Sequence, residues 1–306
     1  MRSTGGLMTR PPLPPLLKTV RRGGTLSCLF LAAVAAVWTF AASGTVHADE
    51  HLFGSLRGAE TLPKGHFDLY QFATFRTGKA AGVYRGFDFD TELEYGVTDK
   101  FQVGVAAINH YFHTRNVDGL DNDSRYRFGG VELSGKYRLL SPFKDVVGLA
   151  FHMESGFLIN DEVGGIRQRE LFFAPSLILQ KNFLDDTLIF EANVGVEYAW
   201  GKKPAEEYDR EFSAQGALGV SYRFAPNWFI GVEGRVRSEY PRFDLEFHEH
   251  TVIFAGPSLH YGAKRWWATA SWGYQVYGNE VDEVVSNKAF AEEARNEFRL
   301  KVGFNF

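Results

Sequence analysis

The last eight residues of the chain read RLKVGFNF and run from Arg299 to Phe306. Every second position is apolar: Leu300, Val302, Phe304 and Phe306. The positions between them are polar or small: Arg299, Lys301, Gly303 and Asn305. A period of two with one apolar and one polar side predicts a β-strand that has a single apolar face.

The same alternation recurs in the chain that precedes this stretch. It is clearest at residues 86–97, where apolar positions alternate with four acidic ones, Asp88, Asp90, Glu92 and Glu94. The pattern predicts twelve strands, at residues 66–76, 86–97, 101–112, 128–139, 146–157, 169–180, 187–200, 210–224, 228–239, 250–261, 266–277 and 295–306. Short turns alternate with longer polar loops between them, so we expect neighbouring strands to run antiparallel.

The expected strands are long enough to cross a membrane. Each has about ten to fifteen residues, and a tilted strand spans a bilayer in about nine to eleven. An even strand number, with short turns at one end and longer loops at the other, is typical of bacterial outer-membrane barrels. Aromatic residues such as Trp228 and Trp200 gather near opposite ends of the strands, as they do at the two interfaces of a bilayer.

A soluble β-sandwich or a lipocalin-like barrel is the alternative, because such folds also have one apolar and one polar face. Here the polar face is too charged for an ordinary core, and the strands exceed the usual five or six residues. The sequence therefore favours an all-β fold, a 12-stranded antiparallel transmembrane β-barrel preceded by a cleaved signal peptide. After the signal, no apolar stretch approaches the length of a membrane-spanning helix.

The N-terminal residues 1–48 have the composition of a secretory signal peptide. Basic residues precede an apolar run at about 26–42, and the small-x-small pattern that ends at Ala48 predicts cleavage there. A membrane helix at 26–42 is the alternative, but the run is short for a full span. Met8 could be the true initiator. We therefore expect a signal peptide at 1–48, a periplasmic lead-in segment at 49–65 and an outer-membrane barrel at 66–306.

The C-terminus resembles the closing strand of bacterial outer-membrane barrels, in which a terminal Phe is read by the assembly machinery. This resemblance implies that Gly303, Phe304 and Phe306 form an assembly signal and that the barrel-assembly machinery is a partner. Outer-membrane lipid is the other expected partner. The net charge of −4 argues against a nucleic-acid partner.

A second resemblance rests on GAETLPKG at residues 58–65 and TELEYGVTDK at residues 91–100. It extends over roughly residues 52–105 and returns at the C-terminus. These stretches look like the opening of uncharacterised bacterial outer-membrane barrels. Some of those are named meta-pathway phenol-degradation outer-membrane proteins, and others are known only as a domain of unknown function. The resemblance implies a barrel fold and brings no established substrate and no catalytic residues; it adds aromatic compounds to the solutes that could be transported.

In such a barrel the polar face lines the interior. The expected lumen-lining residues are Asp88, Asp90, Glu92 and Glu94 in one row, and Lys136, Arg138, Arg223, Arg235, Arg237, Arg299 and Lys301 on other strands. Eight-stranded barrels fill their interiors with side chains and sixteen-stranded ones hold water, so twelve strands permit either. We expect a water-filled lumen, in which neutralising the acidic row alters ion selectivity and leaves stability nearly unchanged. In a closed, salt-bridged lumen the same change would destabilise the fold.

Motifs for catalysis are missing from the sequence. It contains neither a phosphate-binding Gly-rich loop before a helix nor a Gly-x-Ser-x-Gly elbow. His248, His250 and Glu246 have a spacing that could hold a metal ion, but solvated side chains are the preferred interpretation. We therefore expect no catalytic, metal-binding or cofactor-binding residues and no enzyme activity.

The expected function is a narrow channel for passive transport of small solutes, which could include aromatic or amphipathic compounds. A plugged barrel with a structural or surface-interaction role is the alternative. A lipid-active enzyme of the outer membrane is a third, less favoured interpretation. The solute itself cannot be read from the sequence.

Overall fold

The structure, a computed structural model, describes residues 51–161, 163, 167–202, 209–280, 289–290 and 293–306. The expected signal peptide and its cleavage site lie outside these residues. Within them, no helix is long and apolar enough to cross a membrane.

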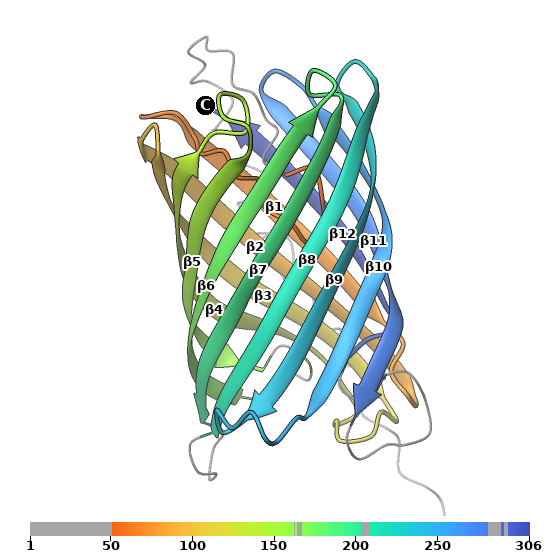
Figure 1. Cartoon of the computed structure of the whole chain (residues 1–306). Helices are drawn as coiled ribbons and strands as arrows, with labels where there is room; N and C mark the ends of the chain where they lie inside the picture. The colour runs from red at the N-terminus through yellow and green to blue at the C-terminus, as the bar shows by residue number, and fades with distance from the viewer. Residues whose placement is uncertain (1–50, 162, 164–166, 203–208, 281–288, 291–292) are drawn as a thin grey trace, which may run out of the picture. The chain divides into compact units, whose positions relative to one another are not determined.

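Twelve antiparallel strands close into a barrel, as the sequence predicts (Figure 1). The strands are β1 (Phe67–Thr77), β2 (Val83–Thr98), β3 (Phe101–Arg115), β4 (Asp123–Leu140), β5 (Gly148–Asn160), β6 (Arg167–Phe183), β7 (Leu188–Lys202), β8 (Asp209–Ala225), β9 (Trp228–Pro241), β10 (His250–Gly262), β11 (Trp266–Glu280) and β12 (Asn296–Asn305). Each strand pairs with the next along the chain, and β1 also pairs with β12. The all-β class, the strand number and the closed antiparallel order are therefore confirmed.

The C-terminal stretch closes the barrel against the first strand. In the β1–β12 ladder Leu69 lies opposite Phe304. The Phe67 N–H donates to the Phe306 carbonyl at 2.8 Å, and the Phe306 N–H donates to the Phe67 carbonyl at 3.0 Å. The rings of these two residues stack with centroids 5.6 Å apart. The last residue therefore completes the seam with both its backbone and its side chain.

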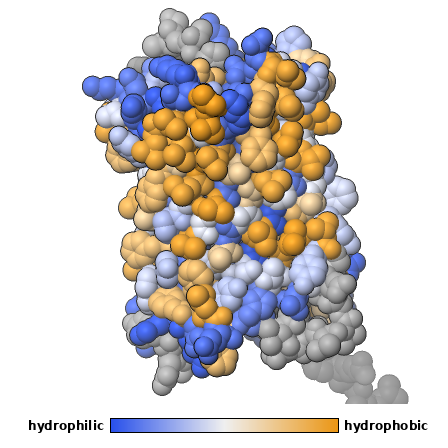
Figure 2. Space-filling model, in the orientation of Figure 1, coloured by the Kyte–Doolittle hydropathy of each residue, from blue (hydrophilic) through white to orange (hydrophobic). Residues whose placement is uncertain are grey.

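Apolar side chains point out of the barrel and polar ones point in. Leu133 and Val232 are 62% and 64% exposed, whereas Glu92 and Lys301 are almost fully buried. Figure 2 shows the outward apolar side chains as a band around the middle of the visible face. This arrangement is the reverse of a soluble protein, and it suits a wall whose outer face contacts lipid.

Short turns gather at the end where β1 begins and β12 ends, at the top of Figure 1. The turn between β8 and β9 consists of Pro226 and Asn227. Asn227 has a φ of 68°, in the left-handed region that Asn tolerates better than most residues. Longer connections, such as residues 242–249, lie at the opposite end. The two ends are called the short-turn end and the long-loop end below.

Residues 51–62, called the inserted segment below, lie inside the barrel. Leu52, Phe53, Leu56 and Ala59 are all fully buried. The sequence pattern predicted a periplasmic lead-in for this part of the chain. The described part of that stretch lies in the lumen, and the chain then enters β1 at Phe67.

Candidate functional site: the occupied lumen

The backbone of the inserted segment is held by side chains of the barrel wall. The N–H groups of Gly54 and Ser55 donate to the carboxylate of Glu233, both at 2.8 Å. Three further N–H groups donate to wall amides: Arg57 to Asn193, Ala59 to Gln180 and Leu62 to Gln102. These partners come from β9, β7, β6 and β3. The segment thus satisfies its backbone by contacts on several sides of the lumen without joining the sheet as a thirteenth strand.

Apolar packing fixes the segment near the short-turn end. Leu52, Phe53 and Leu56 form a buried cluster with Ile189 and Phe229 at the starts of β7 and β9. Gly219 and Gly231 provide the room for the Phe53 ring. A Cβ at Gly219 would lie 2.7 Å from that ring, and one at Gly231 would lie 3.0 Å from it. The absence of side chains at these two glycines therefore leaves the space that the Phe53 ring occupies.

Arg57 is the main ionic contact between the inserted segment and the wall. Its guanidinium donates to Glu154 at 2.5 Å and to the Tyr70 hydroxyl at 3.2 Å. The carboxylates of Glu92 and Glu94 lie 3.6 and 3.8 Å from the same guanidinium. Because the side chains of Glu92 and Glu94 are only 3% and 4% exposed, a cation between them offsets a repulsion that water could not screen.

His51, at the start of the segment, lies among aromatic rings. It stacks on Trp267 with ring centroids 4.5 Å apart, and its centroid is 4.8 Å from that of Tyr70. Burial lowers the pKa of His51 well below its usual 6.5, and the nearby charges of Lys301 and Arg57 lower it further. Neither ring nitrogen has a hydrogen-bond partner among the described residues. The docked imidazole is therefore neutral.

The returning half of the segment contacts bases of β4. The Lys136 ammonium donates to the Gly58 carbonyl at 3.3 Å, and Arg138 pairs with the carboxylate of Glu60. The Ser141 hydroxyl donates to the same carboxylate at 2.9 Å. These contacts lie at the short-turn end, where the segment leads back towards β1.

Two polar cavities occupy the rest of the lumen. The inner cavity, of about 410 Å³, is lined at its base by residues 54–57 of the inserted segment. The outer cavity, of about 440 Å³, lies towards the long-loop end. Both are lined by Arg76, Glu132, Glu154, Arg237 and Glu293, so they adjoin each other. The inserted segment therefore fills the lumen at the short-turn end, and the lumen is hollow between the segment and the long-loop end.

The two cavities differ in charge. Six carboxylates and six bases line the inner cavity. Many of these are paired: Asp88 lies 2.8 Å from Arg76, and Glu297 lies 2.6 Å from Arg235. Ten carboxylates line the outer cavity, against three bases and one histidine. The long-loop end of the lumen consequently has a strong excess of acidic groups.

The predicted lumen-lining residues fall into three groups. Six line the inner cavity: Asp88, Asp90, Arg235, Arg237, Arg299 and Lys301. Four others contact the inserted segment: Glu92, Glu94, Lys136 and Arg138. Arg299 does both, since its guanidinium also donates to the Gly54 carbonyl at 3.1 Å. Arg223 lies at the short-turn end, where it donates to the Asp185 carbonyl at 3.0 Å. The expectation that the whole acidic row faces water is thus wrong for Glu92 and Glu94, whereas the part these residues play in transport stays a prediction.

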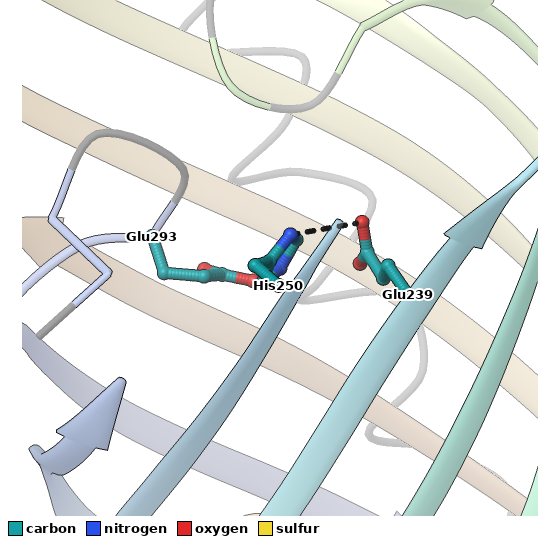
Figure 3. A group of neighbouring side chains, drawn as sticks. All are labelled: Glu239, His250 and Glu293. Atoms are coloured by element: carbon teal, nitrogen blue, oxygen red, sulfur yellow. Dashed lines mark ion pairs between the residues drawn. The ribbon is translucent and has the colours of Figure 1, made fainter. Parts of the chain in front are cut away.

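The histidines near the start of β10 do not form the metal site that the spacing of Glu246, His248 and His250 could have given. His248 bonds Thr251 through Nε2 at 2.7 Å and is only half-buried, and Glu246 is exposed. His250 instead points towards Glu239 of β9 and Glu293, which precedes β12 (Figure 3). One carboxylate or imidazole atom of each lies within 4.8 Å of the other two. Spacing along one strand did not reveal this group, because two of its members come from distant parts of the chain.

A closed twelve-stranded barrel with an apolar outer belt and a charged lumen has the architecture of the outer-membrane β-barrels. The chain belongs to the family of unknown function DUF6662, whose model matches residues 45–306. This agrees with the resemblance to barrels of unknown function noted from the sequence. The comparison with curated proteins found no match.

Solved structures with a similar fold include two outer-membrane proteins. An outer membrane channel from Pseudomonas putida F1 superposes with a TM-score of 0.56 at 10% identity, over 86% of this chain and 100% of that one. The NanC porin superposes with a TM-score of 0.51 at 11% identity, over 77% of this chain and 98% of that one. At such low identity the similarity establishes the fold alone.

Proposed function

We propose that this protein is a channel of the bacterial outer membrane for passive movement of small solutes, and that the inserted segment closes it in the conformation described here. The observation that carries the proposal is the pair of adjoining polar cavities between the segment and the long-loop end. A barrel with a purely structural role has no need of a hollow, charged interior, since small barrels are stable when side chains fill them.

Among the described residues, the inserted segment is the part that fills the lumen at the short-turn end, and opening requires that it leaves. Its backbone bonds to wall side chains, whereas the ladders between the strands do not involve it. Residues 63–66 join the segment to the barrel. Within this connection, the Gly65 N–H donates to the Gly96 carbonyl at 2.8 Å. It can therefore withdraw towards the short-turn end while the barrel stays closed on itself.

The charge of the lumen favours cationic or neutral polar solutes. Ten carboxylates around the outer cavity raise the local concentration of cations and repel anions. The lining of the outer cavity is mostly polar and offers little apolar surface to an aromatic compound. Small polar solutes thus suit this lumen better than the aromatic ones that the family resemblance added.

A reversible crosslink between the segment and the wall tests the proposal. A Cβ at Gly54 would lie 2.9 Å from the Cβ of Ser271, so Gly54→Cys with Ser271→Cys can form a disulfide after a small shift. The single natural cysteine, Cys28, lies in the expected signal peptide. Planar-bilayer recordings should show no channel openings from the oxidised double variant and openings after reduction. Each single-cysteine variant, treated alike, is the control.

Deletion of residues 51–62 gives the complementary measurement. The shortened chain, exported with its own signal, should form a barrel with a large and steady conductance. Heat-modifiable migration on electrophoresis shows whether it has folded. A folded deletion variant that conducts no ions would contradict the channel and favour the second candidate, a plugged barrel with a structural role.

A further inference from the structure

Three potential metal ligands meet at the long-loop end of the lumen: Glu239 of β9, His250 at the start of β10 and Glu293 (Figure 3). The His250 Nδ1 atom is 3.7 Å from the Glu239 Oε2 atom. His250 is only 3% exposed, and all three residues border the outer cavity. One imidazole and two carboxylates make a donor set that divalent transition metals accept.

The barrel holds these ligands in place through its backbone. Glu239 and His250 are direct partners in the β9–β10 ladder, so their side chains start about 5 Å apart. The Glu293 N–H donates to the Ala289 carbonyl at 2.9 Å, and the Ala289 N–H donates to the buried amide of Gln275 on β11 at 2.8 Å. The three ligands are thus brought together by strand pairing and by the bonds that link Glu293 to Ala289 and Ala289 to the wall.

The surroundings of the three ligands carry an excess of negative charge. Arg237 Nε lies 2.6 Å from Glu239 Oε1, which leaves the Oε2 atom on the side of His250. The same guanidinium lies 3.2 and 3.6 Å from Glu197 and Glu211. One base therefore compensates the charge of three carboxylates, and Glu293 adds a fourth carboxylate nearby. A bound divalent cation would neutralise this excess, and a bound cation is often the largest local charge at such sites.

We propose that Glu239, His250 and Glu293 bind a divalent transition-metal cation, for which Zn²⁺ is the best match. Zinc ligands of these types lie about 2.0–2.2 Å from the ion, which places them roughly 3.4 Å from one another in a tetrahedral site. Rotations of the two flexible Glu side chains bring the three donors to that spacing, and water from the outer cavity completes the shell. This site does not depend on the proposed channel activity.

Binding would tie Glu293, and through it Ala289, to the wall formed by β9 and β10. Backbone bonds hold Glu293 near His250 without an ion: the Glu293 N–H donates to the Ala289 carbonyl, and the Arg295 N–H donates to the Gly78 carbonyl at 2.7 Å. The cation would therefore brace the long-loop end of the lumen and partly neutralise its acidic lining. The proposed role of the cation is structural, and the proposal includes no chemical reaction at the ion.

Isothermal titration calorimetry on the mature chain, folded in detergent at pH 7, tests the site. ZnCl₂ should bind at one ion per chain and raise the thermal unfolding temperature, while MgCl₂ should do neither. His250→Ala and Glu293→Gln should each weaken the affinity by about tenfold or more, since even partners beyond the ligands change it by 10–100-fold. His248→Ala is the matched control, because that histidine bonds Thr251 and lies outside the group.

The outcomes separate this site from incidental zinc binding. Equal loss of affinity in His248→Ala and His250→Ala would show that the ion is not held by this group in particular and would overturn the proposal. The absence of saturable binding would overturn the proposal as well, because it would mean that Arg237 and bound protons already neutralise the carboxylates. If His250→Ala fails to fold, Glu293→Gln decides, because Glu293 lies outside the strands.

Discussion

Replacement of Arg57 by alanine should release the inserted segment without unfolding the barrel. The guanidinium contacts Glu154, Glu92 and Glu94, and the last two are nearly inaccessible to water. Removing one partner of a buried ion pair costs about 3–5 kcal/mol, because the other charge is left without compensation. The Arg57 side chain is 19% exposed, so the lower end of that range applies.

A loss of about 3 kcal/mol favours the undocked segment by about a hundredfold, since every 1.4 kcal/mol is a factor of ten. The barrel can avoid the penalty by letting the segment leave and water reach Glu92 and Glu94. Conductance in planar bilayers should therefore rise from rare openings to frequent ones. Thermal unfolding of the barrel, followed by heat-modifiable migration, should change little.

Accessibility of a reporter cysteine gives an independent readout of the same equilibrium. Ser55→Cys lies in the inserted segment, and a bulky maleimide should label it slowly when Arg57 is intact and much faster in Arg57→Ala. Arg223→Ala is the matched control, because Arg223 is also a lumen-side base near the short-turn end but donates to the Asp185 carbonyl of the wall. Slow labelling and rare openings in the Arg57 variant would refute the ionic contact as the determinant of closure.

Three further outcomes are expected. Phe306→Ala should lower the amount of folded barrel in outer-membrane fractions, because the seam with β1 loses the stacking of the Phe306 ring on Phe67 and keeps only backbone bonds there; undiminished heat-modifiable protein would argue against this. Docked His51 has a lowered pKa and takes up a proton less readily than the undocked residue, so docking is strongest above pH 6.5 and weakens as pH falls below it. Openings should thus be more frequent at pH 5 than at pH 8, and His51→Phe should reduce the difference between the two recordings. Gly219→Val should expel the Phe53 ring and raise conductance, whereas the same change in a chain lacking residues 51–62 should have no effect.

Alternation along the chain was sufficient to predict the barrel. Each strand needs only its own residues to present an apolar and a polar face, and twelve such segments with short and long connections have one closed solution in a membrane. Residues that face the lumen follow from the same period, so Asp88 and Arg235 could be placed on the inner surface from sequence. The local signal therefore determined the wall and the direction of its side chains.

The contents of the lumen could not be predicted in the same way. The inserted segment has no period of two, and its backbone partners, such as Glu233 and Gln102, come together only after the barrel closes. Two signals were nevertheless present. Leu52, Phe53 and Leu56 are apolar residues with no place in an aqueous lead-in, and the row of acidic side chains on β2 required a cation that Arg57 supplies.

Barrel closure and lumen closure rest on separate interactions, and this sets the order of conductance among the variants. Moving a two-state equilibrium from 1:99 to 99:1 takes about 5.5 kcal/mol. Loss of the Arg57 contacts supplies roughly 3 kcal/mol, which raises the open fraction but leaves the apolar anchor at Phe53 in place. Deletion of the segment removes both. Conductance should therefore increase from the wild type to Arg57→Ala and again to the deletion, and an Arg57 variant as conductive as the deletion would show that the ionic contacts alone hold the segment.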